Sequence, residues 1–350
     1  MGNNTAEIIM INGARKYSGI GHYASNTYEA VKDQAILISL AFSREDHDAG
    51  LPGNVFNGFY PPITSGWFIN VRFQRFIYSK AFSIVRKVAV NSRIIHYVDP
   101  YVLPLNVPLT PVVSILDVIP LSNDTWAPRM WIKYARKCLE AHKKTENIVT
   151  CSNKVKKEIE NSGFHGRITT IYPYVEDNLK SYFDKKQVRK TLGLPEDKII
   201  VLSVSSKSQR KNLSSIREVM ERVGDKFILV RVGGDIGIGK NFVNVDNTTL
   251  NKIYRAADLL FFPTLDEGFG YPIAEAMANG LPVVSTDLEV TREVTRNAAV
   301  LSEPDVASYT SAIREAVSGL DTLSRKSLNV SRFYEKDRYS SELLNFYNTV

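Results

Sequence analysis

Short runs of β-branched and other apolar residues alternate with helical stretches along the chain, and this rhythm constrains the fold more than any other feature. Most runs are apolar at nearly every position, which is typical of strands buried on both faces of a sheet. Strands and helices in alternation indicate a parallel sheet with helices on both sides, so the sequence predicts an α/β fold of doubly wound parallel sheets. The runs are 7–12, 35–40, 93–98, 111–116 and 147–152 in the first half, and 198–204, 226–232, 258–263, 281–286 and 298–302 in the second.

The rhythm stops once, at the stretch TIYPYVEDN, and then starts again. A chain of 350 residues is longer than one typical core needs, so we place a domain boundary near Tyr172–Asp177. The prediction is two Rossmann-like domains, residues 1–171 and 172–330, that face each other across a cleft. A polar and aromatic helix near 321–348 dominates the last segment, 331–350, which either caps the second domain or crosses back to the first.

The composition is that of a folded, soluble protein, with 44% apolar and 23% charged residues. Cys138 and Cys151 are too few for a disulfide framework or a metal cluster, which favours buried or inert thiols in a reducing compartment. No run reaches the roughly 18 apolar residues that a membrane-spanning helix requires. We therefore expect a cytoplasmic protein.

Positive charge is concentrated in the first half of the chain. The net charge is +7, and residues 1–170 contain 20 Lys and Arg against 13 Asp and Glu, whereas residues 171–350 contain 24 of each. This asymmetry indicates an anionic partner for the first domain, or else a solvated basic surface. Segments 71–87 and 129–144 have the pattern of basic amphipathic helices, which either lie on an anionic membrane surface or pack on a sheet. We expect no nucleic-acid partner.

Three glycine-containing segments need an interpretation of their own. Residues 50–70 are too rich in Gly, Pro and aromatic residues for a strand or a helix, and predict a functional loop or one that packs on itself. GIGHYA, 19–24, matches a dinucleotide fingerprint but does not leave its strand at once. GDIGIGKN, 234–241, resembles a P-loop, but Asn241 replaces the required hydroxyl and a strand-like pattern follows. Neither match predicts its usual ligand, although both loops could meet an anion.

The stretch EGFGYPIAEAM, residues 267–277, places two glutamates eight positions apart on two structural elements. ADLLFF predicts a buried strand that Pro263 ends, so Glu267 follows on a loop at the carboxyl end, where open α/β sheets bind ligands. Pro272 suits the first turn of the next helix, so Glu275 lies about one turn into it. We expect both carboxylates to face one pocket.

The backbone between the two glutamates is suited to an anion or to hydroxyl groups. Gly268, Phe269, Gly270 and Tyr271 offer successive N–H groups that run into a helix N-terminus. A carboxylate accepts two hydrogen bonds side by side, which suits a vicinal diol. A nucleotide sugar has the matching layout, with a ribose diol at one end, a sugar diol at the other and a diphosphate between them.

A basic turn supports this interpretation. SSKSQRKN, residues 205–212, follows the first strand of the second domain and opens a helix at about Asn212. It places Arg210 and Lys211 at the carboxyl end of another strand, where two cations can neutralise a departing diphosphate without a metal ion. An ordinary exposed basic turn is the alternative.

These motifs resemble the retaining glycosyltransferases of family 4, which have the two-Rossmann fold called GT-B. The resemblance rests on DLLFFPTLDEGFGYPIAEAMANGLPVVSTD together with SQRKN, and it is strongest over residues 198–302. Its specific elements are two Glu separated by seven residues, GFG between them, and then EAMA-x-G-x-PV. SGIGHY and VVSILDVIPL are similar to the family's first glycine-rich loop and its HDLIPL strand end.

The resemblance implies a role for each matching residue of the second domain. It assigns the ribose diol to Glu275, and the transferred sugar near its anomeric centre to Glu267. It assigns the diphosphate to Arg210 and Lys211, and backbone contacts with sugar and phosphate to residues 268–271. The second domain would thus bind the donor.

For the first domain, the resemblance implies acceptor binding, with Gly19 and Gly21 reaching the diphosphate from across the cleft. It also implies a reaction without cofactor or metal ion, in which the nucleotide-diphosphate sugar is a substrate and the anomeric configuration is kept. Front-face attack, with the leaving phosphate taking the proton of the acceptor, is the mechanism that the family implies.

Two departures from the family pattern affect the expected site. Leu116 stands where the family has a histidine, beside Asp117, which stays a catalytic candidate. His96 or His22 could serve instead, and the alternative for each is a packed or exposed histidine. Ser206 replaces the arginine of a Gly-Arg pair; Arg210 beside Lys211 is similar to a subgroup that often transfers mannose, which favours GDP-mannose over a UDP-sugar.

Other functions stay open at this point. A sugar-nucleotide epimerase or a phosphorylase could share the fold, and a non-catalytic nucleotide-sugar binding protein would fit the loss of the family histidine. A dehydrogenase is a further alternative. The acceptor could be a lipid-linked glycan, a protein, a polysaccharide or a small molecule.

Overall fold

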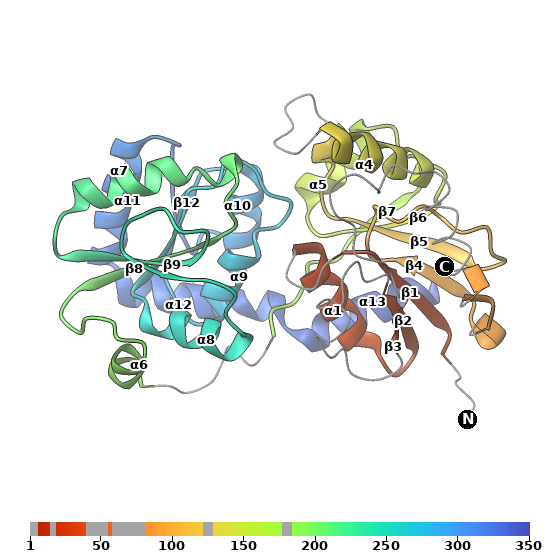
Figure 1. The fold of residues 1–350 in the computed structure, drawn as a ribbon, viewed down its shortest axis with the longest axis horizontal. Coiled ribbons are helices and arrows are strands. Elements are labelled where there is room, and N and C mark those ends of the chain that lie inside the picture. The colour runs from red at the N-terminus through yellow and green to blue at the C-terminus, as the bar shows by residue number, and fades with distance from the viewer. Residues whose placement is uncertain are drawn as a thin grey trace. The chain divides into compact units, whose positions relative to one another are not determined.

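The structure is a computed structural model that describes residues 6–14, 19–39, 55–57, 82–83, 85–87, 89–121, 129–176 and 184–350. It divides into two compact α/β units, which Figure 1 shows together. The first unit combines Met1–Pro173 with Asp337–Val350, and the second is Tyr174–Lys336.

The first unit contains one parallel sheet in the order β3-β2-β1-β4-β5-β6-β7. β1, β2 and β4 are buried at every position, as the continuous apolar runs predicted. The order reverses at β1, so the switch point lies between β1 and β4. The strands are β1 (Ile8–Asn12), β2 (Ala35–Ser39), β3 (Val55–Asn57), β4 (Ile94–Tyr97), β5 (Thr110–Ile115), β6 (Asn147–Thr150) and β7 (Arg167–Thr170), and the main helices are α1 (Gly19–Val31), α4 (Arg129–His142), α5 (Asn153–Asn161) and α13 (Lys336–Asn348).

The second unit contains a parallel sheet in the order β10-β9-β8-β11-β12-β13. This is the strand order of a dinucleotide-binding fold, and its switch point lies between β8 and β11. The strands are β8 (Ile199–Ser205), β9 (Phe227–Gly233), β10 (Lys240–Phe242), β11 (Leu259–Phe262), β12 (Val283–Thr286) and β13 (Val300–Ser302), and the helices are α6 (Lys185–Thr191), α7 (Leu213–Val223), α8 (Asn247–Ala256), α9 (Tyr271–Ala278), α10 (Glu289–Thr295), α11 (Val306–Ser318) and α12 (Leu320–Ser331).

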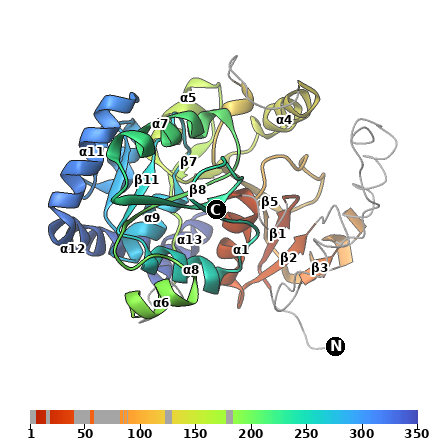
Figure 2. The ribbon, with the colours of Figure 1, turned by 60° about the vertical axis from the view of Figure 1, so that its left-hand side comes forward.

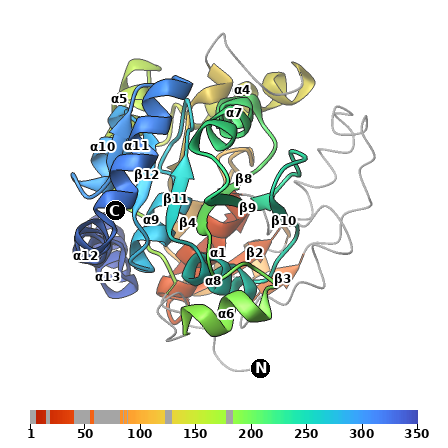
Figure 3. The same ribbon diagram turned by 90° about the vertical axis from the view of Figure 1, so that its left-hand side faces the viewer.

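Helices cover both faces of the second sheet. α7 and α11 pack together on one face, where Ile216 and Ile313 join Val201, Phe261 and Val284 of the strands in one apolar cluster. α8 and α9 contact the other face. Figures 1 and 3 show α7 and α8 on opposite sides of the sheet. The fold prediction of parallel, doubly wound sheets is therefore confirmed.

The C-terminal helix differs from the prediction of one helix over about 321–348. The chain forms α12, then a 3₁₀ turn at Arg332–Tyr334, then α13. α13 lies beside α1 in Figures 1 and 2, with Tyr339 Oη 2.8 Å from Thr27 Oγ1 and Ser340 donating to the carbonyl of Ala30. Residues 337–350 thereby belong to the first unit.

Two edge strands were not predicted. β3 lies within residues 50–70, where we expected no strand, and it pairs with β2 at one edge of the sheet. β7 at the opposite edge has the sequence RITT, which is only partly buried. The other interpretations of 50–70 and most of 71–87 concern residues outside the described ranges, as does Asp177. Cys138 and Cys151 form no disulfide and both are buried, as predicted.

Candidate active site

Two loops leave the second sheet at its switch point. Residues 206–211 follow β8, and residues 263–270 follow β11 and lead into α9. Gly270 has a φ of 90°, a conformation that L side chains rarely adopt, and Pro272 occupies the first turn of α9. Asn212, at a φ of 50°, precedes α7 as predicted. Because β8 and β11 are parallel, both loops lie at the carboxyl ends of the strands, on the same side of the sheet.

Hydrogen bonds join the two loops directly. The backbone N–H of Leu265 donates to the carbonyl of Arg210 at 2.7 Å, and the hydroxyl of Thr264 donates to the same carbonyl at 3.2 Å. In the other direction, the guanidinium of Arg210 donates to the carbonyl of Asp266 at 2.8 Å. These reciprocal contacts fix the position of one loop against the other.

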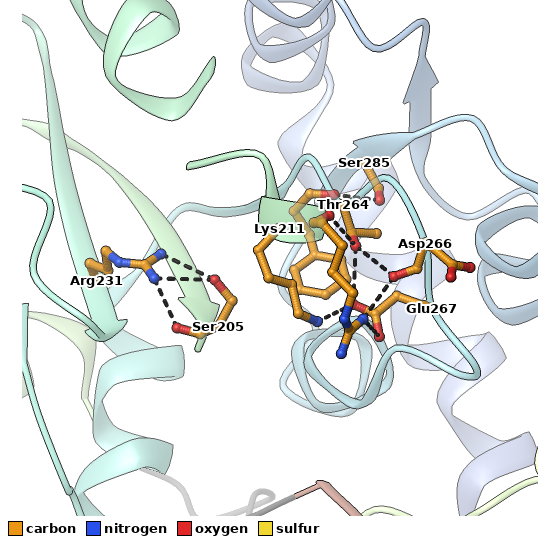
Figure 4. A network of polar contacts seen from close by, with 9 residues as sticks. Ser205, Lys211, Arg231, Thr264, Asp266, Glu267 and Ser285 are labelled. Carbon is orange, nitrogen blue, oxygen red and sulfur yellow. Dashed lines mark hydrogen bonds and ion pairs between the residues drawn. The ribbon is translucent and has the colours of Figure 1, made fainter. Parts of the chain in front are cut away.

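Glu267 binds both cations of the basic turn (Figure 4). Its Oε2 lies 3.0 Å from Nη1 of Arg210, and its Oε1 contacts Nζ of Lys211 and accepts from the hydroxyl of Thr264 at 3.1 Å. Lys211 is 8% exposed and Glu267 is 7% exposed, and the ammonium group lies 5.0 Å from the ring centroid of Phe262. The sequence predicted the place of these residues but not that they pair with one another.

Burial and charge act against each other in this triad. Burial raises the pKa of Glu267, but Lys211 and Arg210 outweigh it and hold that pKa below its ordinary value. Burial lowers the pKa of Lys211 more than the Glu267 carboxylate raises it. Two cations therefore contact one buried carboxylate, and the charge of Asp266 also acts on Lys211.

Glu275 lies one turn into α9, as predicted, and is buried. Its Oε2 accepts a hydrogen bond of 2.6 Å from the phenol of Tyr254 in α8. Burial, together with the charge of Glu275, raises the pKa of Tyr254 well above its ordinary value, so the phenol stays protonated and donates. The role of Tyr254 could not be predicted from the sequence, because a tyrosine on the buried face of a helix has the pattern of an ordinary core residue.

The segment between the glutamates is held by aromatic packing. The ring of Phe269 is buried and makes edge-to-face contacts with Tyr271 at 5.4 Å and Tyr334 at 5.5 Å between centroids. This packing fixes the backbone of residues 268–271 at the start of α9, where Gly268 is partly exposed. The side chain of Phe269 is thereby structural, and the predicted contacts of this residue concern its backbone.

The remaining candidates lie in the first unit. Gly19 begins α1 and is exposed, whereas Gly21 is buried within the helix. Asp117 follows β5, and its Oδ1 accepts from the backbone N–H of Ile119 at 3.3 Å and from the phenol of Tyr101 at 3.4 Å. Gly19 and Asp117 each follow a strand of the first sheet on its carboxyl side.

His96 is the exception among the predicted residues. It is 0% exposed, and its two ring nitrogens contact the phenol of Tyr347 at 2.5 Å and the hydroxyl of Ser114 at 2.8 Å. Burial lowers its pKa to about 3, so the ring is neutral. These are the properties of a packed histidine, and we do not carry His96 forward as a catalytic residue.

A buried arginine at the same edge of the second sheet was not predicted. Arg231, near the end of β9, is 0% exposed and contacts the ends of β8 and β9. Its Nε donates to the carbonyl of Gly234 at 2.7 Å, and its Nη2 donates to the carbonyl of Ser205 at 2.8 Å. Figure 4 shows the contacts between Arg231 and Ser205 in the same view as the Lys211–Glu267 group, from which they are separate.

Residues that could hold a metal ion were also sought in the described parts of the chain. Within them, no group of three or more His, Cys, Asp or Glu side chains has an arrangement that could bind one. In those same parts no helix is both long enough and apolar enough to cross a lipid bilayer.

Comparison with known proteins connects this geometry to one family. Residues 184–327 match the family Glycosyl transferases group 1. The chain is 26% identical over 229 residues to the O-antigen chain mannosyltransferase RfbU of Salmonella typhimurium. That match covers 60% of this chain and 61% of the relative, so it falls short of the relative's whole length. Both matches therefore cover only part of the chain.

Solved structures show the same fold over the whole chain. A sucrose-phosphate synthase from Thermosynechococcus elongatus has a TM-score of 0.79 at 19% identity, over 98% of each chain. Anabaena HepE, in complex with UDP and glucose, has a TM-score of 0.76 at 14% identity, over 99% of this chain and 100% of HepE. The two-domain GT-B architecture is therefore shown.

Proposed function

We propose that this chain is a glycosyltransferase of the group 1 family, which moves a sugar from a nucleotide-diphosphate sugar to an acceptor hydroxyl. The observation that carries the proposal is the gathering of Arg210, Lys211 and Glu267, with Glu275 on the adjoining helix, at the switch point of the second sheet. Open α/β sheets bind their ligands at this place.

The two cations would bind the diphosphate of the donor. Arg210 and Lys211 both contact the Glu267 carboxylate, and a diphosphate at the carboxyl end of the sheet would bind these two cations. Negative charge grows on the leaving phosphate during transfer, and cations fixed by a buried network stabilise that charge without reorganising. Because these side chains supply the neutralising charge, we propose a reaction that needs neither a metal ion nor a cofactor.

The two glutamates would hold the two ends of the donor. Glu275 would accept hydrogen bonds from the ribose diol while Tyr254 fixes one of its oxygens. Glu267 would contact the transferred sugar near its anomeric carbon, and the N–H groups of residues 268–271 would bind sugar and phosphate oxygens at the start of α9. Gly19 and Gly21 are proposed to contact the diphosphate, and Asp117 is proposed to take part in catalysis.

We propose that transfer retains the anomeric configuration. The bond between the anomeric carbon and the diphosphate oxygen breaks, and a bond to the acceptor oxygen forms on the same face. The proton of the acceptor hydroxyl passes to the leaving diphosphate. Determination of the product anomer by NMR coupling constants tests this step, and an inverted product would refute it.

Two relatives suggest two donors. Similarity to a mannosyltransferase, together with adjacent Arg210 and Lys211, favours GDP-mannose, whereas the neighbouring HepE structure contains UDP and glucose. We propose that the donor is one of these two types of nucleotide sugar and that the acceptor is a glycan, lipid-linked or other.

The place of action follows from the basic first half. We propose a cytoplasmic enzyme that contacts anionic membrane through α4, which is basic and exposes Met130 and Trp131 at its beginning. Cosedimentation with anionic vesicles at low salt tests this contact. A protein that stays in the supernatant would contradict it.

The first experiment is thermal stabilisation by GDP, UDP, ADP, dTDP and NAD and by the corresponding sugar nucleotides, because a ligand of the folded state raises the melting temperature. We expect a shift with one nucleoside diphosphate and its sugar, and its loss in Glu275→Ala. Transfer with radiolabelled donor then separates a transferase from an epimerase or phosphorylase. A shift with NAD alone, or with no nucleotide, would refute the proposal.

A further inference from the structure

Two buried arginines lie near opposite ends of the strands of the second sheet, one at the amino ends and one at the carboxyl ends. They differ in how their charge is balanced. Arg189 of α6 is at the amino edge, where its Nη2 contacts Oδ2 of Asp258 at 2.6 Å. The same carboxylate oxygen accepts from the backbone N–H of Ile200 at the start of β8. Arg189 also donates to the carbonyls of residues 196, 198 and 256. Its charge is paired with a carboxylate in the usual way.

Arg231 at the carboxyl edge has no such carboxylate. Its guanidinium group donates five hydrogen bonds, to the carbonyl of Gly234, the hydroxyl of Ser203 and the carbonyl and hydroxyl of Ser205, all of which are neutral. Among the described residues, none forms an ion pair with Arg231, and Asp235, whose charge raises the pKa of Arg231, is exposed. Burial lowers that pKa, yet an arginine stays charged in proteins.

A buried charge without a counterion is costly, so its position needs an explanation. Ser205 is the last residue of β8, and the basic turn with Arg210 and Lys211 follows it directly. β9 approaches β8 so closely here that a Cβ on Gly233 would lie 2.0 Å from the carbonyl oxygen of Ser205. Arg231 therefore holds a full positive charge at the base of the loop that carries the two proposed diphosphate ligands.

We infer that Arg231 is a positioning residue for the anionic part of the donor: its positive charge, which no ion pair balances among the described residues, lies at the ends of β8 and β9 and favours a diphosphate at the carboxyl ends of these strands. The inference rests on the proposed function and adds a residue that does not itself touch the ligand. In a buried setting a charge acts over a longer distance than in water, because the effective dielectric constant is lower.

The test measures binding by calorimetry in the guanosine and uridine series, each as nucleoside, monophosphate and diphosphate, with inorganic pyrophosphate as a base-independent probe. We expect Arg231→Gln to lower the affinity for the diphosphate and for pyrophosphate about tenfold and to lower the affinity for the monophosphate less. The affinity for the nucleoside should not change. High salt should reduce the difference between the variant and the original protein.

Two further variants separate charge from structure. Arg231→Lys keeps the charge but loses the fork of hydrogen bonds, and it should keep most of the diphosphate affinity. Arg189→Gln is the matched control, since it removes a buried but paired arginine; it should lower the melting temperature and leave pyrophosphate binding unchanged. We expect Arg231→Gln to cost less stability than Arg189→Gln.

The outcomes are distinguishable. Equal weakening of nucleoside and diphosphate in Arg231→Gln, equal losses in Arg231→Lys and Arg231→Gln, or an unfolded Arg231→Gln would each overturn the inference in favour of a structural role. Full diphosphate affinity in Arg231→Gln would overturn it while leaving the proposed function intact. If the unsubstituted protein binds no diphosphate and no pyrophosphate, the proposed function and this inference fail together.

Discussion

Replacing Glu267 by Gln removes the charge that both Arg210 and Lys211 contact, and it should be strongly destabilising. Lys211 is 8% exposed, and its ammonium group would be left against the ring of Phe262 and a neutral amide. Removing one partner of a buried ion pair costs about 3–5 kcal/mol, because the other charge stays buried without compensation. Arg210 is more exposed and relaxes toward water more easily.

The magnitude can be checked against a second substitution at the same place. Lys211→Met keeps an unbranched apolar stem beside Phe262 and leaves Glu267 paired with Arg210 at 3.0 Å. The double variant Glu267→Gln/Lys211→Met contains neither the carboxylate nor the buried ammonium group, so it should recover about 2 kcal/mol or more relative to Glu267→Gln alone. A loss of 3–5 kcal/mol corresponds to a fall of roughly 6–20 °C in melting temperature for a unit of this size.

Urea unfolding followed by circular dichroism measures the free energies of this cycle. The control is Asp287→Asn, which breaks the exposed pair between Arg292 and Asp287 and should cost at most about 1 kcal/mol. The pKa of Glu267 is lowered in the folded state, so its contribution to stability is present at neutral pH and is lost as the pH falls through that pKa. A Glu267→Gln variant that loses less than the control, or a double variant that recovers nothing, would refute this reasoning.

Three further predictions concern buried polar groups. Burial raises the pKa of Asp99 to about 6, so its contribution to stability is full below the unfolded value and is lost as the pH rises through 6. Asp99→Asn should remove a fall of about 2 kcal/mol in unfolding free energy between pH 4 and pH 7, which urea titrations at both pH values measure. His96→Phe should lower the free energy of unfolding by about 2–4 kcal/mol, because the hydroxyls of Ser114 and Tyr347 lose a hydrogen-bond partner. The rate of sugar transfer, assayed well below the melting temperature of the variant, should not change. A large loss of rate would show that His96 belongs to the active site. Tyr254→Phe should weaken the binding of ribonucleoside diphosphates about tenfold, and the binding of their dideoxy analogues, which lack the ribose diol, much less. Equal weakening of both would contradict the orientation of Glu275 by this phenol.

The sequence predicted the strands best where both faces are buried. β1, β2 and β4 are mostly apolar and are buried at every position, as expected of strands that are covered on both faces. β7 contains two threonines and is partly exposed, so its composition resembles that of a loop. β3 was hidden in a segment whose average composition is dominated by Gly, Pro and aromatic residues, although Val55–Asn57 itself suits an edge strand.

The sequence predicted which residues of the site lie close together where each of them follows a predicted strand. Glu267 and Lys211 follow predicted strands, and the rule that parallel strands end at one edge placed them together. Their pairing across 56 residues depends on the conformations of two loops, which no local pattern contains. Arg231 was missed for a different reason: it lies in a strand-like run, FILVRVG, in which one charged residue does not alter the periodic pattern.

The placement of α13 also affects how the protein is made. Tyr339 and Tyr347 complete buried hydrogen bonds with Thr27 and His96, yet the ribosome adds them only after all of the second unit. The first unit therefore begins its synthesis early and completes its core late, whereas residues 174–336 form one uninterrupted stretch that can fold as it emerges. During translation the order of folding would then be the reverse of the order of synthesis, and an incomplete chain would expose the unsatisfied core of its own amino-terminal half to chaperones.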